Sequence, residues 1–233
     1  MKKISVAALV FLFIFTSLYA QDAGRFTFGA RGGFQAGIGK TTDAFKTLEN
    51  NLGDTLSGNK INVDEQAGVG GNLVLSAAYG FTNSIGLQTE LNFMIGQGKE
   101  LRHTSNNSNY IEFSYSTLDI PLLLKVNFLS TQSRFGVLGG PYFTLPLGQA
   151  SITYNGAFNN SDEKTDISAP NFGYTFGLYG GFSLMGLRWV ADIRYIQDFG
   201  TSTLKKWGAV GATNLGFMNR RGIVVSVGAE YTL

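Results

Sequence analysis

Eight stretches of this 233-residue chain alternate strictly between apolar side chains and small or polar ones. In residues 25–39 the apolar column is Phe26, Phe28, Ala30, Gly32, Phe34, Ala36 and Ile38. The other stretches are 67–81, 85–97, 111–128, 134–147, 171–185, 187–199 and 221–233. Successive side chains of a strand point to opposite faces, so this period of two predicts eight strands whose sheet has two chemically different faces.

The segments between these stretches alternate in length. Three are short, at 82–84, 129–133 and 185–186, and four are long and polar, at 40–65, 98–109, 148–169 and 200–215. This pattern predicts an all-β fold, an eight-stranded antiparallel up-and-down transmembrane β-barrel with short periplasmic turns and long extracellular loops. A closed barrel leaves no unpaired backbone edge in lipid. A soluble β-sandwich is the alternative, but it does not predict such alternating connections.

The first 20 residues have the pattern of a secretory signal peptide. Lys2 and Lys3 form a basic start, the segment 4–17 is apolar, and the small residue Ala20 precedes the expected cleavage. The apolar segment is shorter than the roughly 20 residues that a membrane-spanning helix needs. We therefore expect a cleaved leader at 1–20 and a barrel domain at 21–233, exported to the outer membrane of a Gram-negative-type (diderm) bacterium.

Composition narrows the classes of partner. Without Lys2 and Lys3, the 18 basic residues fall to 16, which equals the number of acidic residues and argues against a nucleic-acid partner. The chain has no Cys, which excludes disulfides, thiolate metal sites and a lipid-modified N-terminal cysteine. Charged residues are only 15%, against about 25% in soluble domains. We expect outer-membrane lipid to cover the apolar column of a monomeric barrel.

Aromatic residues gather near both ends of the expected strands, at the depth of the two membrane interfaces. Those near the short turns are Tyr79, Phe81, Phe128, Phe135, Phe182, Trp189 and Tyr231. Those near the loops are Phe113, Tyr115, Phe143, Tyr174, Tyr195 and Phe199.

Ionisable residues fall in the other, inward column. They are Arg31, Glu90, Asp119, Lys125, Arg188, Asp192, Arg194 and Glu230. Charges inside a narrow barrel must be paired or hydrated. We expect a network of ion pairs that fills the lumen, and a narrow porin-like pore for small solutes is the alternative. The first and last strands must be neighbours in a closed barrel, which brings the inward columns of Arg31 and Glu230 side by side. The third and fourth strands are also neighbours, which places the column of Glu90 beside that of Asp119 and Lys125. The stagger of the strands decides which acid meets which base.

The stretch "GFQAGIGKTT", residues 33–42, is similar to a phosphate-binding loop. A P-loop needs its first glycine five positions before the Gly-Lys pair, and Phe34 occupies that position here. The glycines have a packing explanation instead. In a barrel of eight strands the interior is just wide enough for side chains. Gly29, Gly33 and Gly37 are therefore expected to make room for larger groups from facing strands.

Candidate catalytic and metal-binding residues are sparse. His103 is the only histidine, and none of Ser105, Ser108 or Ser114 stands at a recognisable spacing from it as a nucleophile. Asp162, Glu163 and Asp166 have carboxylates that suit Ca²⁺, but their segment lacks the ligand spacing and turn glycine of a calcium loop. We expect no catalytic residues, no metal and no cofactor; an outer-membrane lipid-modifying enzyme is the less favoured reading.

Two consecutive strands carry a family resemblance. "LDIPLLLKVNF" (118–128) and "RFGVLGGPYFTLPL" (134–147) resemble the small outer-membrane barrels that include PorT-like proteins and are of the OmpA/OmpX type. The matching positions are Asp119, Pro121, Lys125, Gly140, Pro141 and Tyr142. The resemblance implies an outer-membrane barrel, and some PorT-like members are linked to protein secretion. Loops that contact an extracellular or envelope protein are the expected functional surface.

Overall fold

The computed structural model describes residues 23–38, 63–103, 110–128, 133–155, 162–168, 171–200, 202–207, 212–218 and 220–233. These ranges exclude the expected signal peptide and most of the first long loop. Twelve strands occur in them: β1 (Phe26–Gly37), β2 (Val63–Ala67), β3 (Val69–Gly80), β4 (Ile85–His103), β5 (Tyr110–Asn127), β6 (Ser133–Asn155), β7 (Asp162–Ser168), β8 (Asn171–Leu184), β9 (Leu187–Asp198), β10 (Ser202–Trp207), β11 (Ala212–Met218) and β12 (Arg221–Thr232). No helix in the described ranges is long and apolar enough to cross a membrane.

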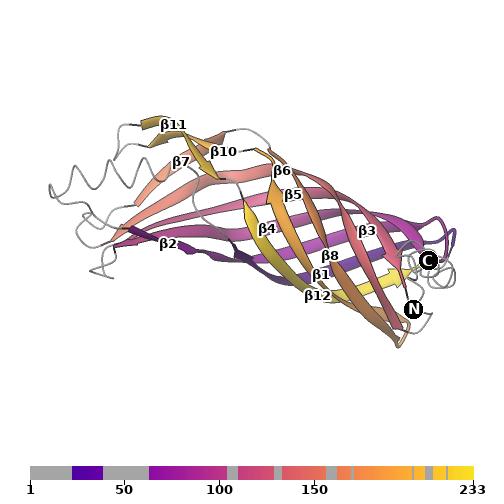
Figure 1. The fold of residues 1–233 in the computed structure, drawn as a ribbon. Helices are drawn as coiled ribbons and strands as arrows, with labels where there is room; N and C mark the ends of the chain where they lie inside the picture. The colour runs from indigo at the N-terminus through magenta and orange to yellow at the C-terminus, as the bar shows by residue number, and fades with distance from the viewer. Residues whose placement is uncertain are drawn as a thin grey trace, which may run out of the picture.

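Eight of these strands close into a ring (Figure 1). The order around the ring is β1, β3, β4, β5, β6, β8, β9 and β12, and every neighbouring pair is antiparallel. The pairing of β12 with β1 joins the two ends of the chain's sheet. The expected eight-stranded up-and-down barrel is therefore confirmed, with strand bounds close to those of the eight alternating stretches.

All four of the expected long loops contain strand residues, which corrects the sequence prediction. β4 continues to His103 and β6 to Asn155, while β7 pairs with β6, β10 with β7, and β11 with β10. β2 pairs with the far end of β4. The long strands pass through β-bulges near Gly96 and Gly148, whose positive φ values of 66° and 75° suit glycine. Figure 1 shows this extended sheet at one end of the barrel.

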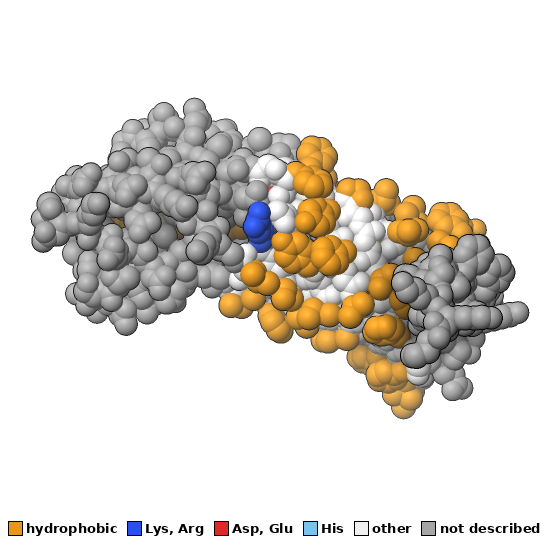
Figure 2. Space-filling view, viewed as in Figure 1, with side chains coloured by type: hydrophobic (Ala, Val, Ile, Leu, Met, Phe, Trp, Pro, Cys, Tyr) orange, Lys and Arg blue, Asp and Glu red, His pale blue; other side chains and the backbone are white. Residues whose placement is uncertain are grey.

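The two faces of the barrel differ as the alternation predicts. Large apolar side chains are exposed on the outward face, and Figure 2 shows them spread over the wall of the barrel. Aromatic pairs occur toward both ends, for example Phe26 with Tyr79 at 4.9 Å and Phe143 with Phe172 at 5.0 Å between ring centroids. Phe113 and Tyr115 do not join the outer aromatic residues. Both are buried, because they share the inward column of Asp119 on β5.

Glycines lie directly opposite large inward side chains in the strand register. The cross-strand pairs are Gly228 with Arg31, Gly29 with Glu230, Gly177 with Arg194, Gly136 with Tyr179, and Gly173 with Tyr142. A Cβ atom added at Gly228 would lie 2.8 Å from the Cγ of Arg31, and one added at Gly177 would lie 3.0 Å from the Cγ of Arg194. The packing role expected for Gly29 is thus present. At Gly33, as at Gly228 and Gly177, the added Cβ would also meet the backbone of the neighbouring strand, here 2.7 Å from the Cα of Ser226.

Substitution of Gly29 tests this packing. In Gly29→Val, the Cβ would lie 2.7 Å from Ser76 Oγ and 2.9 Å from Glu230 Cγ, so we expect the free energy of unfolding to fall by about 1–3 kcal/mol. Gly71→Val is the matched control, because Gly71 points outward and a Cβ there meets nothing within 4 Å. Urea unfolding in lipid vesicles measures both; equal losses would contradict the packing role.

Candidate functional site

The lumen of the barrel collects the charged side chains. All eight residues of the expected network have 9% or less of their surface exposed. Arg134, Asp198 and Arg220 are further buried charged residues in the described part of the chain. Asp198 is an even number of residues from Asp192 on β9, so the alternation in the sequence already places it in the inward column. Arg220 lies just before the last alternating stretch. Alternation assigns a face only to residues within a strand, so the sequence pattern does not place Arg220 in the lumen.

Glu90 is the centre of the first layer of this network. Arg194 contacts it with both terminal nitrogens, Nη1 to Oε2 at 2.6 Å and Nη2 to Oε1 at 2.9 Å. Arg31 and Gln88 also donate to Glu90. β4 and β9, which carry Glu90 and Arg194, lie four strands apart in either direction around the ring. This two-pronged ion pair therefore spans the full width of the lumen.

Arg31 and Arg194 also share Asp192. The Nε atoms of these two arginines lie 3.4 Å and 2.7 Å from the carboxylate oxygens of Asp192. The Nη1 atom of Arg31 also lies 3.5 Å from Glu230, so the side-by-side placement expected for this pair is found. The ion-pair partners of Glu90 are Arg31 and Arg194, which lie on β1 and β9 rather than on the neighbouring strand β5.

Glu230 joins a second group of cations nearer the short turns. Lys125 Nζ lies 3.4 Å from its Oε1 atom, and Arg188 Nη1 lies 3.9 Å from Oε2. Lys125 also sits over the ring of Tyr179, 4.6 Å from the ring centroid. Lys125 on β5 and Glu230 on β12 are again on opposite sides of the ring.

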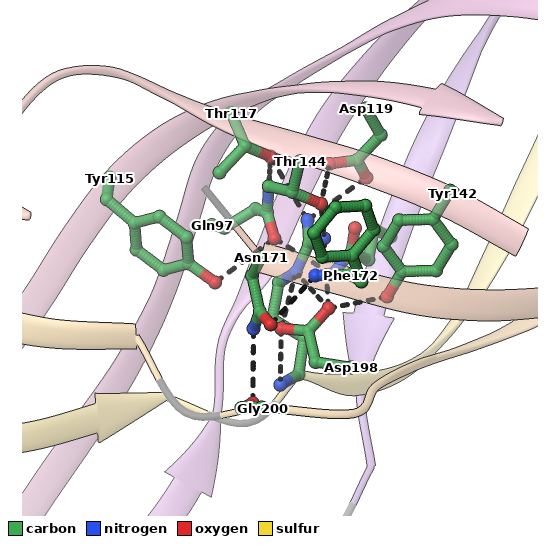
Figure 3. A network of polar contacts seen from close by, with 12 residues as sticks. Gln97, Tyr115, Thr117, Asp119, Tyr142, Thr144, Asn171, Phe172, Asp198 and Gly200 are labelled. Atoms are coloured by element: carbon green, nitrogen blue, oxygen red, sulfur yellow. Dashed lines mark hydrogen bonds and ion pairs between the residues drawn. The ribbon is translucent and has the colours of Figure 1, made fainter. Parts of the chain in front are cut away.

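Arg220 organises a third group toward the loop end (Figure 3). Its Nη1 donates to Asp119 at 3.0 Å, and its Nη2 donates to Asp198 at 3.1 Å and to Thr144 at 2.6 Å. The hydroxyl of Tyr142 donates to Asp198 at 2.5 Å. Figure 3 shows these groups converging from several strands. One guanidinium thus ties β5 to the opposite side of the ring.

The side-chain amide of Gln97 and its hydrogen-bond partners lie next to the Arg220 group. Gln97 Nε2 donates to Thr117 at 2.8 Å, and Gln97 Oε1 accepts from Gln35 and Tyr115, both at 3.1 Å. Gln97 would face outward by the parity of the third stretch. The bulge at Gly96 shifts the register of β4 by one residue and turns this amide inward.

Apolar clusters and a small cavity complete the filling of the lumen. Met94, Tyr142, Ile196 and Val224 form one buried cluster, and Leu123, Leu138 and Tyr179 form another. A cavity of about 10 Å³ lies between the Arg194 and Asp119 groups, which is room for about one water molecule. Ion pairs and apolar clusters together fill the cross-section of the barrel.

The family-motif residues lie on β5 and β6. Lys125 belongs to the Glu230 group, and Asp119 and Tyr142 belong to the Arg220 group. Pro121 is the register partner of Tyr142. Gly140 and Pro141 lie beside them on β6. Three of the motif positions thus hold the lumenal network.

The weaker candidate sites do not assemble in the described part of the chain. Ser105, Ser108 and the His103 side chain lie outside it, and Ser114 is on the outward face of β5. Asp162, Glu163 and Asp166 belong to β7 rather than to a loop. Tyr154 donates to Glu163 at 3.2 Å, and Gln149 donates to Asp166 at 3.0 Å. Among the described residues, no group of three or more His, Asp or Glu side chains is placed to hold a metal ion.

The Glu90–Arg194 pair is open to a double-mutant test. Glu90→Gln leaves two arginines without their main partner, and Arg194→Gln leaves a buried carboxylate, so each should lower the free energy of unfolding by about 3–5 kcal/mol. The double substitution should cost clearly less than the sum of the two. Glu112→Gln, at an exposed position of β5, is the control and should change stability by about 0.5 kcal/mol or less. Simple additivity of the two lumenal changes would contradict the coupling.

Comparison with known proteins places this geometry in a family. The family model described as outer membrane protein beta-barrel domain matches residues 19–231. OprG of Pseudomonas aeruginosa is similar over 92% of this chain and 98% of its own, with 14% identity and a TM-score of 0.52. A major outer membrane protein of Thermus thermophilus is similar over 91% and 100%, with 14% identity and a TM-score of 0.51. The search of curated proteins found no match. The two structures share the fold, and the family match over nearly the whole chain shows that the protein belongs to the outer-membrane β-barrel domain family.

Proposed function

We propose that this outer-membrane barrel is a plugged, non-enzymatic scaffold that binds an extracellular or envelope protein through the sheet at its loop end. The observation that carries the proposal is the length of three strands. β4 has 19 residues, β5 has 18 and β6 has 23, whereas a membrane-spanning strand needs about 9–11. The surplus projects beyond the bilayer on the external side, because the short turns of such barrels are periplasmic.

The projecting part is a packed structure. It joins β2, β7, β10 and β11 to the far ends of β4, β5 and β6. Its inner face is apolar and buried, with Ile111, Phe113 and Ile152 all at 2% exposure or less. Its outer face carries polar residues such as Glu112 on β5. Membrane anchoring requires no sheet of this kind, and rigid scaffolds of this type commonly present binding surfaces.

The filled lumen supports a scaffold over a transporter. The ion-pair contacts Glu90–Arg194, Lys125–Glu230 and Asp119–Arg220 join opposite sides of the ring across the passage that a solute would use. The closed ring leaves no barrel strand edge for another copy to pair with, which supports a monomer. Cleavage of the leader at 1–20 is part of the same proposal.

A narrow pore is the second candidate, and one observation favours it. Several buried polar atoms have no hydrogen-bond partner, among them both amide atoms of Asn72, the Oγ of Ser226 and the Nε of Arg188. Buried polar groups of this kind usually bind water. Water beside the ion pairs is compatible with a plug, but a continuous file of water would allow small ions to pass.

Planar-bilayer conductance separates the two candidates. The refolded protein should show no steady conductance at physiological salt, because the spanning ion pairs block the lumen. A wide porin inserted by the same protocol is the positive control. Steady channels from the unmodified protein would overturn the plug and favour the pore.

Site-specific crosslinking tests the binding surface. The chain has no Cys, so one cysteine introduced at Glu112 carries a photo-crosslinker on the outer face of the projecting sheet. A protein partner should be captured there in living cells. The matched control is a cysteine at Phe176, which is exposed on the outward face of the barrel wall and should not capture it. Equal capture at both positions, or none at Glu112, would contradict this surface.

A further inference from the structure

The outward face of the barrel contains a hollow of about 980 Å³ over β6, β8, β9 and β12. Its floor is Gly180 and Ala191, which are direct register partners on β8 and β9. We call this hollow the pit. Its volume falls within the range of about 300–1,000 Å³ that is usual for small-molecule sites.

Large apolar side chains surround the floor on every side. Leu178 and Ile193 lie one outward position toward the loops, and Phe182 and Trp189 lie one outward position toward the short turn. Phe135 on β6 flanks Gly180, and Val227 on β12 flanks Ala191. The surrounding side chains are 43–60% exposed and rise above the two small residues. The pit therefore exists because two adjacent outward positions lack large side chains.

The pit lies in the periplasmic half of the membrane. Gly180 and Ala191 are each five residues from the β8–β9 turn at Met185–Gly186. With a rise of about 3.3 Å per residue and a tilt of about 40°, that separation is roughly 12 Å along the barrel axis. The hydrocarbon core is about 30 Å thick, so this depth falls in the leaflet next to the short turns.

We propose that the pit holds one acyl chain of a phospholipid from the periplasmic leaflet, in preference to the lipids that contact the rest of the wall. The pit is continuous with the face that the bilayer covers, so hydrocarbon is the medium around it. A chain seated in it gains dispersion contacts with the floor and the surrounding side chains that a flat wall does not offer. The rings of Trp189, Phe182 and Phe135 supply large contact area at small cost in side-chain entropy.

A second copy of this chain fits the pit less well. A two-fold dimer contact centred here would place the pit against itself, because such a contact joins the same patch of both subunits. Two facing hollows would both stay unfilled. A flexible acyl chain can bend to follow the floor, so it is the occupant that the shape favours.

Tryptophan fluorescence tests the site, because Trp189 lies on its border. The only other tryptophan, Trp207, is on β10 and is removed by Trp207→Phe. In vesicles that contain rising fractions of phosphatidylcholine brominated near the middle of one chain, quenching of Trp189 reports chains in the pit. Gly180→Leu fills the pit without backbone strain, since an added Cβ lies 3.5 Å from Arg134 O and 4.0 Å from Phe135 Cδ2. Gly71→Leu adds the same side chain to the outward face of β3 and serves as the matched control.

The quantity to compare is the fraction of brominated lipid that gives half-maximal quenching of Trp189. We expect this fraction to be at least about threefold higher in Gly180→Leu than in the parent. Gly71→Leu should behave like the parent. Ala191→Leu, which fills the pit from β9, should repeat the effect of Gly180→Leu. Heat-modifiable gel mobility checks that each variant is folded. Identical quenching curves in all folded variants would overturn the site, as would an equal shift in Gly71→Leu. A dimer on crosslinking that Gly180→Leu abolishes would replace the lipid with a second copy.

Discussion

Closure of the hydrogen-bonded ring is the constraint on which the rest of this structure depends. In hydrocarbon, every backbone N–H and C=O group needs a partner within the protein, and the pairing of β12 with β1 supplies the last of them. Closing only eight strands fixes a narrow interior. Side chains in the inward column are therefore forced together whether or not they attract, and their charges must balance locally. The ion pairs are a consequence of closure as much as a support for it.

Narrowness also explains the glycines. Large side chains need small neighbours in a narrow cross-section, and several of the lumenal arginine, glutamate and tyrosine residues have a glycine as a register partner in the next strand. Gly228 beside Arg31 and Gly177 beside Arg194 show the rule for charged residues. Gly136 beside Tyr179 shows it for an aromatic ring. The same residue type on the outward face has the opposite effect, since Gly180 leaves a hollow in a wall of large side chains.

The alternation of side chains was enough to predict the barrel, because each strand must show one face to lipid and the other to the lumen. It also placed Arg31, Glu90 and the other charges inside. The alternation did not predict the orientation of Gln97, because the bulge at Gly96 turns this side chain inward. It also did not predict the strands beyond the bilayer, where no lipid imposes an apolar face. The partner of Glu90 depends on strand stagger and on side-chain reach across the lumen, which a pattern along one strand does not record.

The ion pairs that cross the lumen join residues about one hundred positions apart, with separations of 104 for Glu90–Arg194, 105 for Lys125–Glu230 and 101 for Asp119–Arg220. Such contacts cannot form within a single hairpin. Lys125 and Asp119 gain the attraction of Glu230 and Arg220 only when the last segment of the chain joins the ring. Non-local contacts of this kind are associated with slow folding. The Glu230 and Arg220 groups thus depend on the last segment of the chain, whereas Arg31, Glu90 and Arg194 lie on strands that precede it.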